Sequence, residues 1–415
     1  MAYEFTPDDV AFLRSRYGDK ALQSAAELAL TPSSLLADLT VLRARYPEHA
    51  AALAETVRAR RRAVGKFPRP DRLLADEASV QQATAGPVAA LRAGDIVARH
   101  PGAVVHDVTC SIGGELLALA AEPGVRGVLG SDVDPVRLTM AQHNLETGVS
   151  GRRPTLLRAD ALTPTSTADV IVADPARRDA GGRVFGIDRL DPPLLELLAV
   201  YAGRAMVVKC APGLDYRKLR TRFGFEGQVQ VVSLDGGVRE TCLWTEVRGA
   251  PENRASVLRT VPDPAADPGT PARTRLYEVT SDDPDELDDP AVGEYIVDPD
   301  GAVVRAGLVR QYAHRHGLRQ LDPQIAYLSG DVVPAGERGF RVIEQLPMHE
   351  KTLRGALAAR GCGSLEILVR GLDVDPDRLR KRLKLKGDQP FALILTRIGR
   401  AGVAFLCEPG FRAGL

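Results

Sequence analysis

Four aspartates and a pair of glycines have the residue types and spacing of a ligand site. They are Asp107, Gly113, Gly114, Asp132, Asp160 and Asp174. Glycine permits a tight turn from a strand into a helix and the close approach of a ligand, because it has no Cβ. A carboxylate at a strand end can accept hydrogen bonds from both hydroxyls of a ribose. The set therefore predicts a site for a nucleotide-like ligand.

Asp132 is the preferred ribose ligand in this set. It lies 25 residues after Asp107, which is the length of one helix and the strand that follows it. Asp134 is the second candidate, but it directly precedes Pro135, and this pair is typical of a helix N-cap. Glycine turns also occur where a helix only packs closely on a strand, so the prediction depends on all the positions together.

Short apolar runs alternate with helical segments from about residue 77 to 248, which is typical of βαβ units and a parallel sheet. The expected strands are 104–108, 125–131, 155–158, 169–173, 205–209, 229–234 and 240–247. The last two are joined through Asp235, Gly236 and Gly237 and predict an antiparallel hairpin. We therefore expect an α/β fold with a Rossmann-like, seven-stranded sheet. The carboxyl ends of its parallel strands would bring the four aspartates to one crevice.

The length of 415 residues predicts two to three domains. Residues 1–76 have apolar positions at helical spacing and predict a helical N-terminal region. The sheet domain is expected at 77–250. Residues 251–290 are rich in Pro and Asp and predict a linker, and 291–415 mix helical and strand-like runs, which indicates an α+β domain.

The composition excludes several classes of protein. Apolar residues make up 44% and charged residues 26%, as in ordinary globular proteins, and no apolar run is long enough for a membrane span. The N-terminus lacks a secretory pattern, so we expect a cytoplasmic protein without a membrane partner. The five cysteines form no Cys-x-x-Cys pair and predict no metal site. Basic and acidic residues are equal at 54 each, so any argument for a nucleic acid must be local.

The run from Asp107 to Arg178 resembles the class I S-adenosylmethionine (SAM)-dependent methyltransferases, and the resemblance covers about residues 77–248. Its first turn is most similar to the Asp-x-x-Cys-x-x-Gly-Gly form of some RNA-modifying members, such as the cap trimethylguanosine synthases. The resemblance implies SAM as the cofactor. It further implies the following ligands: Asp107, Gly113 and Gly114 for the methionine part, Asp132 for the ribose and Asp160 for the adenine amine.

The whole chain also resembles a bacterial group of methyltransferases with a C-terminal THUMP-like domain. The segments that carry this resemblance are 82–84, 295–299 and 383–387. THUMP domains bind RNA, so the resemblance implies an RNA substrate. A cationic run fits phosphate contacts or a solvated helix face, and it includes Arg380, Lys381, Arg382, Lys384 and Lys386. A second basic run, residues 58–69, leaves the same two alternatives open.

The acceptor of the methyl group has two candidate chemistries. In amino-methylating members of the resembled class, an Asn or Asp followed by two prolines and an aromatic residue grips the target amine. Asp174 and Pro175 match this pattern, whereas Arg177 replaces the aromatic residue and could stack on a base. The alternative is carbon-5 methylation of a pyrimidine, in which Cys210 would add to the ring and Glu240 would remove the proton.

Two further classes of protein compete with a methyltransferase. The altered Asp-Pro-Ala-Arg motif is compatible with a non-catalytic RNA-binding protein. A dehydrogenase is disfavoured, because the first loop lacks Gly-x-Gly-x-x-Gly and the terminal hairpin is a methyltransferase trait.

Overall fold

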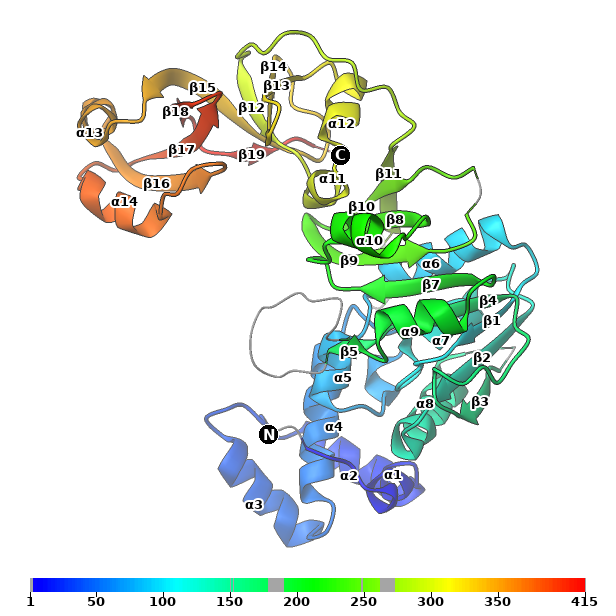
Figure 1. Cartoon of the computed structure of the whole chain (residues 1–415). Helices are drawn as coiled ribbons and strands as arrows, with labels where there is room; N and C mark the ends of the chain where they lie inside the picture. The colour runs from blue at the N-terminus through cyan, green and yellow to red at the C-terminus, as the bar shows by residue number, and fades with distance from the viewer. Residues whose placement is uncertain are drawn as a thin grey trace. The chain divides into compact units, whose positions relative to one another are not determined.

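A computed structural model describes residues 3–149, 151, 153–177, 190–247, 249–261 and 273–414 (Figure 1). The chain divides into two units. The first comprises Met1–Val229, Arg239–Ala250 and Asp263–Arg273, and the second comprises Gln230–Val238, Pro251–Pro262 and Thr274–Leu415. Each unit is described separately below.

The seven expected strands are present, but they belong to a nine-stranded sheet in which β10 (Asn253–Val261) and β11 (Arg273–Thr280) continue beyond β8. The seven are β1 (Val104–Asp107), β2 (Gly127–Asp132), β3 (Thr155–Arg158), β4 (Val170–Ala173), β7 (Ala205–Cys210), β8 (Gln228–Leu234) and β9 (Gly237–Trp244). They follow the order β3-β2-β1-β4-β7-β9-β8. The first five are parallel, and β9 runs antiparallel to β7, with Lys209 opposite Cys242. The predicted parallel strands and the antiparallel hairpin are confirmed, but the hairpin does not close the edge of the sheet, because β10 lies beside β8.

Both faces of the central strand β4 are buried, which explains its continuous apolar run. In β4, Val170 and Val172 contribute to one hydrophobic core, and Ile171 and Ala173 contribute to the other. The helices that pack in the first core are α6 (Gly86–Arg99), α7 (Gly114–Ala121) and α8 (Pro135–Gly148). The second core contains α9 (Leu194–Val200) and α10 (Tyr216–Phe223). A two-stranded ribbon, β5 (Ala176–Arg177) with β6 (Leu190–Asp191), follows β4.

The N-terminal region is helical, as its periodicity predicts. Its elements are α1 (Pro7–Leu13), α2 (Arg16–Ala26), α3 (Leu35–Arg45), α4 (Ala50–Ala63), a 3-10 turn (Pro70–Arg72) and α5 (Glu77–Gln82). Leu53 and Val57 of α4 belong to the same core as the first face of the sheet. The N-terminal helices are therefore an integral part of the first unit.

The basic run at 58–69 contacts protein groups. Arg58 and Arg62 pair with Glu77, the latter at 2.7 Å. Arg61 donates to backbone carbonyls at the end of α2, including that of Ala26 at 3.0 Å. Lys66 donates to the carbonyls of residues 80 and 81. These cations hold the N-terminal helices together, and such pairing argues against a phosphate-binding surface.

The second unit corrects the expected linker. Residues 251–290 contain two strands, β10 (Asn253–Val261) and β11 (Arg273–Thr280), while 262–272 lie outside the described residues. In β10 the side chains of Ala255 and Val257 are buried in a core with Val279 of β11. The Pro and Asp content of the region masked this apolar pattern.

The remainder of the second unit is α+β, as expected. An eight-stranded sheet has the order β13-β14-β12-β15-β18-β17-β16, with β19 paired to β15. These strands are β12 (Tyr295–Asp298), β13 (Arg319–Asp322), β14 (Ile325–Gly330), β15 (Arg338–Pro347), β16 (Cys362–Val369), β17 (Gln389–Ile398), β18 (Ala401–Cys407) and β19 (Phe411–Arg412). The helices are α11 (Gly301–Ala306), α12 (Val309–Arg315), α13 (Glu350–Ala359) and α14 (Pro376–Leu383). Leucines of α13 and α14 pack in one core with β16 to β18.

Candidate active site

A cleft of about 1430 Å³ lies at the carboxyl ends of β1, β2, β4 and β7 in the first unit. Asp107, Asp132, Asp160 and Asp174 all line it. Their positions at successive strand ends bring them together, although they are far apart in the sequence. The predicted convergence of the four aspartates is confirmed.

The turn after β1 is shaped by its backbone. Gly113 has a φ of +84° and caps the N-terminus of α7. A Cβ on Gly113 would lie 3.3 Å from the Cβ of Ala141, and Gly113 itself does not line the cleft, whereas Gly114 does. Ser111 has a φ of +47°, an uncommon conformation for a residue with a side chain. Its amide donates to Asp132 Oδ2 at 2.9 Å, so the strained turn ties the first two strand ends together.

Asp107 is almost completely buried at the end of β1. Its Oδ1 accepts a hydrogen bond from the amide of Thr109 at 3.0 Å. Burial, together with the nearby Glu115 carboxylate, raises the pKa of Asp107 to about 8. Near neutral pH the Asp107 carboxyl is therefore mostly protonated, and a positive group beside it would favour its ionised form.

Asp132 and Asp134 have different environments. Asp132 accepts from the amides of Ser111 and Asp134, each at 2.9 Å. Asp134 is the N-cap of α8 and accepts from the amides of Val136 and Arg137. The N-cap interpretation of Asp134 is confirmed.

Asp160 and Asp174 are exposed in the cleft. Asp160 accepts from the amide of Leu162 at 2.8 Å. The amide of Asp174 donates to Thr109 Oγ1 at 2.7 Å, which connects the end of β4 with the turn after β1. Pro175 is buried and lines the cleft. Arg177 belongs to β5, but its side chain lies outside the part of the chain that the structure describes.

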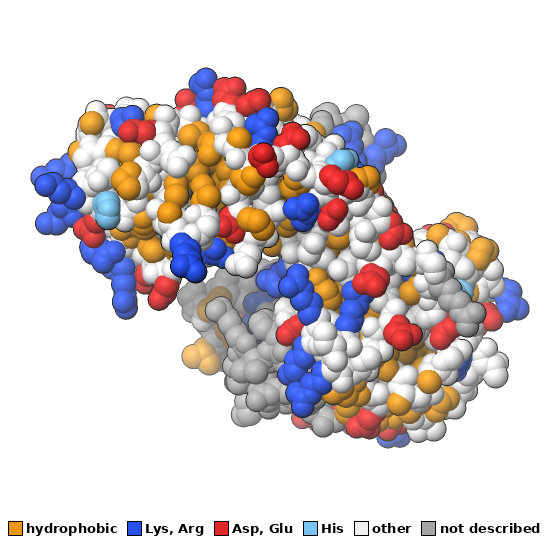
Figure 2. All heavy atoms as spheres, turned by 45° about the horizontal axis from the view of Figure 1, so that its top comes forward, with side chains coloured by type: hydrophobic (Ala, Val, Ile, Leu, Met, Phe, Trp, Pro, Cys, Tyr) orange, Lys and Arg blue, Asp and Glu red, His pale blue; other side chains and the backbone are white. Residues whose placement is uncertain are grey.

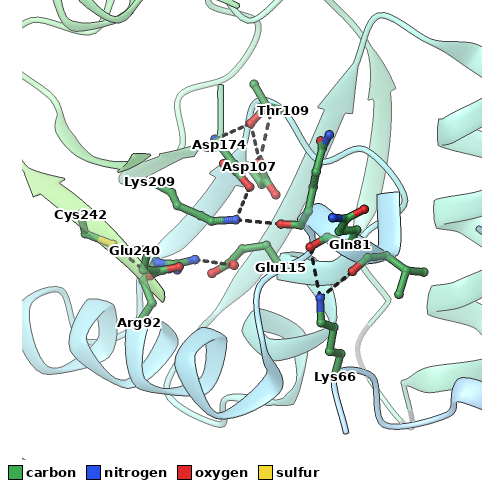
Figure 3. Close-up of polar contacts among 12 residues, drawn as sticks. Lys66, Gln81, Arg92, Asp107, Thr109, Glu115, Asp174, Lys209, Glu240 and Cys242 are labelled. Carbon is green, nitrogen blue, oxygen red and sulfur yellow. Dashed lines mark hydrogen bonds and ion pairs between the residues drawn. The ribbon is translucent and has the colours of Figure 1, made fainter. Parts of the chain in front are cut away.

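Lys209 connects two walls of the cleft (Figure 3). Its Nζ lies 2.5 Å from Asp174 Oδ2 and 3.4 Å from the carbonyl oxygen of Gln82, at the end of α5. Its side chain is only 13% exposed. Burial alone would lower the pKa of Lys209, but Asp174 and Glu240 raise it above its ordinary value. The ammonium group is therefore a permanent charge.

A buried ion-pair cluster lies beside Lys209 (Figure 3). Arg92 of α6 pairs with Glu115 of α7 at 2.5 Å and with Glu240 of β9. Glu240 also accepts a hydrogen bond from the Cys242 thiol at 3.2 Å. Although burial opposes it, Arg92 and Lys209 lower the pKa of Glu240. The Glu240 carboxylate is thus held by Arg92 and is a weak proton acceptor.

Cys210 is buried at the end of β7, among the residues of the second core, on the face opposite Val207. Burial raises the pKa of its thiol, and the negative charges of Asp174 and Glu240 raise it further. Because the thiolate is the nucleophilic form, this environment disfavours covalent catalysis by Cys210.

Sequence reasoning identified the aspartates but assigned no role in the site to Thr109, Ser111, Lys209 and Arg92. Thr109 and Ser111 lie in the turn after β1. Their polar side chains, so close to Asp107 in the sequence, could have indicated that they belong to the site. Lys209 and Arg92 form ion pairs with residues that are distant in the sequence, so no local pattern predicts these contacts.

The predicted RNA-binding residues lie in and directly after α14. Arg380 pairs with Asp377 at 2.5 Å, and Arg382 pairs with Glu350 of α13 at 3.2 Å. Lys381, Lys384 and Lys386 are exposed and form no ion pair with any residue in the described ranges. Figure 2 shows Lys and Arg side chains at the left of the view, over α13 and α14. Three lysines of the run are thus available to a ligand.

Within the described residues, His, Cys, Asp and Glu side chains form no group of three that could hold a metal ion. In the same part of the chain, no helix has the length and apolar character needed to cross a membrane.

Comparisons with known proteins cover nearly the whole chain. It is 49% identical over 381 residues to an S-adenosylmethionine-dependent methyltransferase found in two strains of Mycobacterium tuberculosis, an alignment that spans 89% of this chain and 99% of the relative. A crystal structure described as a methyltransferase from Porphyromonas gingivalis W83 has the same fold, with a TM-score of 0.72 at 19% identity over 95% of this chain and 98% of that one. Residues 337–409 match the family model "THUMP domain-like", and residues 6–63 match a domain of unknown function.

Proposed function

This chain belongs to the S-adenosylmethionine-dependent methyltransferases, and on that premise we propose that it methylates a nitrogen of a nucleobase in RNA, either an exocyclic or a ring amine. The observation that carries this proposal is Asp174, followed by Pro175, at the carboxyl end of β4 in the acidic cleft. A carboxylate there can accept a hydrogen bond from an amine that reacts in the same cleft.

The residues that line the cleft have the chemistry needed to bind SAM. The neutral, buried Asp107 carboxyl would ionise beside the methionine ammonium group, and Gly114 would allow the methionine part to approach the backbone. Gly113 would contribute indirectly, by allowing the turn that leads into α7. Asp132 would accept from the ribose hydroxyls and Asp160 from the adenine amine. When bound, SAM supplies an electrophilic methyl group on a sulfonium.

The protein's contribution to the transfer is mainly positioning. Asp174 would hold the acceptor amine by a hydrogen bond, so that the nitrogen lone pair points along the line of transfer. The nitrogen–methyl bond forms as the sulfur–methyl bond breaks, and the proton lost by the amine passes to solvent. Arg177, which replaces the aromatic residue of the resembled motif, would stack on the base.

RNA is the acceptor favoured by the second unit. The match to a THUMP domain-like family and the exposed lysines 381, 384 and 386 support contacts with phosphates. Arg380 and Arg382 would contribute less, since each already has an acidic partner. Family membership as an enzyme disfavours the non-catalytic alternative.

The test is transfer of a radiolabelled methyl group from SAM to total RNA from a strain that lacks the gene, with protein and DNA as comparison substrates. We expect label in RNA, in a single modified nucleoside on an amine nitrogen. Label in protein alone, or on a carbon atom of a base, would contradict the proposal.

The raised pKa of Asp107 predicts that SAM binding releases a proton. At pH 7 a carboxyl with a pKa of about 8 is mostly protonated, and pairing with the ammonium group requires the ionised form. Binding at pH 7 should therefore release roughly 0.9 proton, and affinity should rise as pH increases from 6 to 8. Calorimetry in buffers of different ionisation enthalpy measures the release, and Asp107→Asn should abolish it. Proton-neutral binding by the parent protein would refute the assignment of Asp107.

Cys210→Ala separates nitrogen from carbon-5 methylation. The buried thiol and the ion-paired Glu240 disfavour carbon-5 chemistry. We expect the variant to retain kcat within about threefold of the parent, because a small buried residue replaces a thiol that takes no part in the reaction. A loss of several orders of magnitude, with SAM affinity unchanged, would instead support Cys210 as the nucleophile.

A further inference from the structure

The two oxygens of the Asp174 carboxylate differ in their hydrogen bonding. Asp174 Oδ2 accepts from Lys209 Nζ at 2.5 Å, whereas Oδ1 accepts no hydrogen bond within the described parts of the chain. The Asp174 side chain is 47% exposed, so a carboxylate at this position would otherwise rotate among several orientations. Lys209 is itself largely buried and held between two acceptors, and it can therefore impose one orientation.

We propose that Lys209 is a positioning residue: it fixes Asp174 through Oδ2 and leaves Oδ1 as the acceptor for the substrate amine. This inference depends on the proposed function, because it assigns the open oxygen to an amine that Asp174 binds. Binding through one fixed oxygen would set the direction of the nitrogen lone pair, which a freely rotating carboxylate would not do.

The neighbouring charges support a fixed ammonium group at this position. Asp174 and Glu240 act on Lys209 from the strands on either side of β7, and Arg92 shields Glu240 by its own ion pair. The Gln82 carbonyl adds an acceptor from α5, which belongs to the N-terminal helical segment. The N-terminal helices thereby contribute to the orientation of Asp174.

Lys66 provides a matched control. Its Nζ donates to the carbonyls of Val80 and Gln81, the segment that Lys209 contacts at Gln82, but it has no contact with Asp174. A variant of Lys66 therefore loosens the same segment without removing the ion pair. Any effect specific to Asp174 should appear in Lys209→Met and not in Lys66→Met.

The experiment compares Lys209→Met, Lys209→Arg and Lys66→Met with the parent protein in transfer of labelled methyl groups to RNA. We expect Lys209→Met to lower kcat about 10- to 100-fold, with KM for SAM within twofold, and Lys209→Arg to recover most of the loss. Lys66→Met should keep kcat within about threefold. Equal losses in both methionine variants, or an unchanged kcat in Lys209→Met, would overturn the proposal.

A double-mutant cycle with Asp174→Ala adds a second criterion. If Lys209 acts through Asp174, Lys209→Met should cost nothing more in the Asp174→Ala background. An undiminished cost there would overturn the proposal.

The four proteins of this cycle are the parent, Lys209→Met, Asp174→Ala and the double variant, and they are also compared by thermal unfolding without RNA. Non-additive shifts in Tm are expected for a coupled pair, and additive shifts would overturn the positioning role. If the parent labels no RNA, the proposed function fails, and the unfolding cycle still decides whether Lys209 and Asp174 are coupled.

Discussion

Replacing Asp174 with alanine should reduce methyl transfer about 100- to 1000-fold while leaving SAM affinity within about threefold of the parent. Removal of one preorganised polar group from a reacting centre typically has this cost in kcat. The effect should fall on kcat, because Asp174 would touch the acceptor and not SAM. Asp174→Asn should also lose most of the activity, because its single amide oxygen would accept from Lys209 and its NH2 group, a donor, would face the substrate amine.

Asp169 at the opposite end of β4 is the matched control for this prediction. It is exposed and pairs with Arg126 at 3.4 Å, away from the cleft-lining residues. Asp169→Asn makes the same chemical change as Asp174→Asn, at the residue that precedes β4, and should leave kcat unchanged. Equal residual activity in Asp174→Ala and the parent would show that the acceptor site has been wrongly placed.

The sequence predicted the sheet and the aspartates because both follow local rules. Buried parallel strands require continuous apolar runs such as Val170 to Ala173, and the ends of these strands place polar residues at one edge. The turn after β1 required glycine at position 113, where φ is positive. These features can be recognised within a window of a few residues.

The rest of the site depends on contacts between distant segments. Lys209 contacts the carboxylate of Asp174, 35 residues away in the sequence, and the carbonyl of Gln82, 127 residues away. No spacing rule predicts either contact. Composition was also misleading. The Pro and Asp content of 251–290 indicated a linker although β10 and β11 lie there. The cations at 58–69 left a phosphate-binding surface open as an alternative, whereas Arg61 donates to backbone carbonyls at the end of α2.

Asp132→Ala should weaken SAM binding at least about 100-fold in calorimetric titration. Each hydrogen bond from a ribose hydroxyl to a charged acceptor contributes about 1.5–3 kcal/mol, and 1.4 kcal/mol corresponds to a tenfold change in affinity. Two such bonds would be lost together. The substitution also removes the acceptor for the amide of Ser111, whose strained turn lines the cleft after β1.

Asp134→Ala is the control that separates ligand binding from helix capping. Asp134 lies two residues further along and accepts from two amides at the start of α8. Its loss should cost about 1 kcal/mol of stability, as for other N-caps, with SAM affinity within about threefold of the parent. Comparable losses of affinity in the two variants would mean that the turn's integrity, and not a contact with the ribose, explains the effect of Asp132. A loss confined to Asp132→Ala would establish the carboxylate at the end of β2 as the ribose ligand.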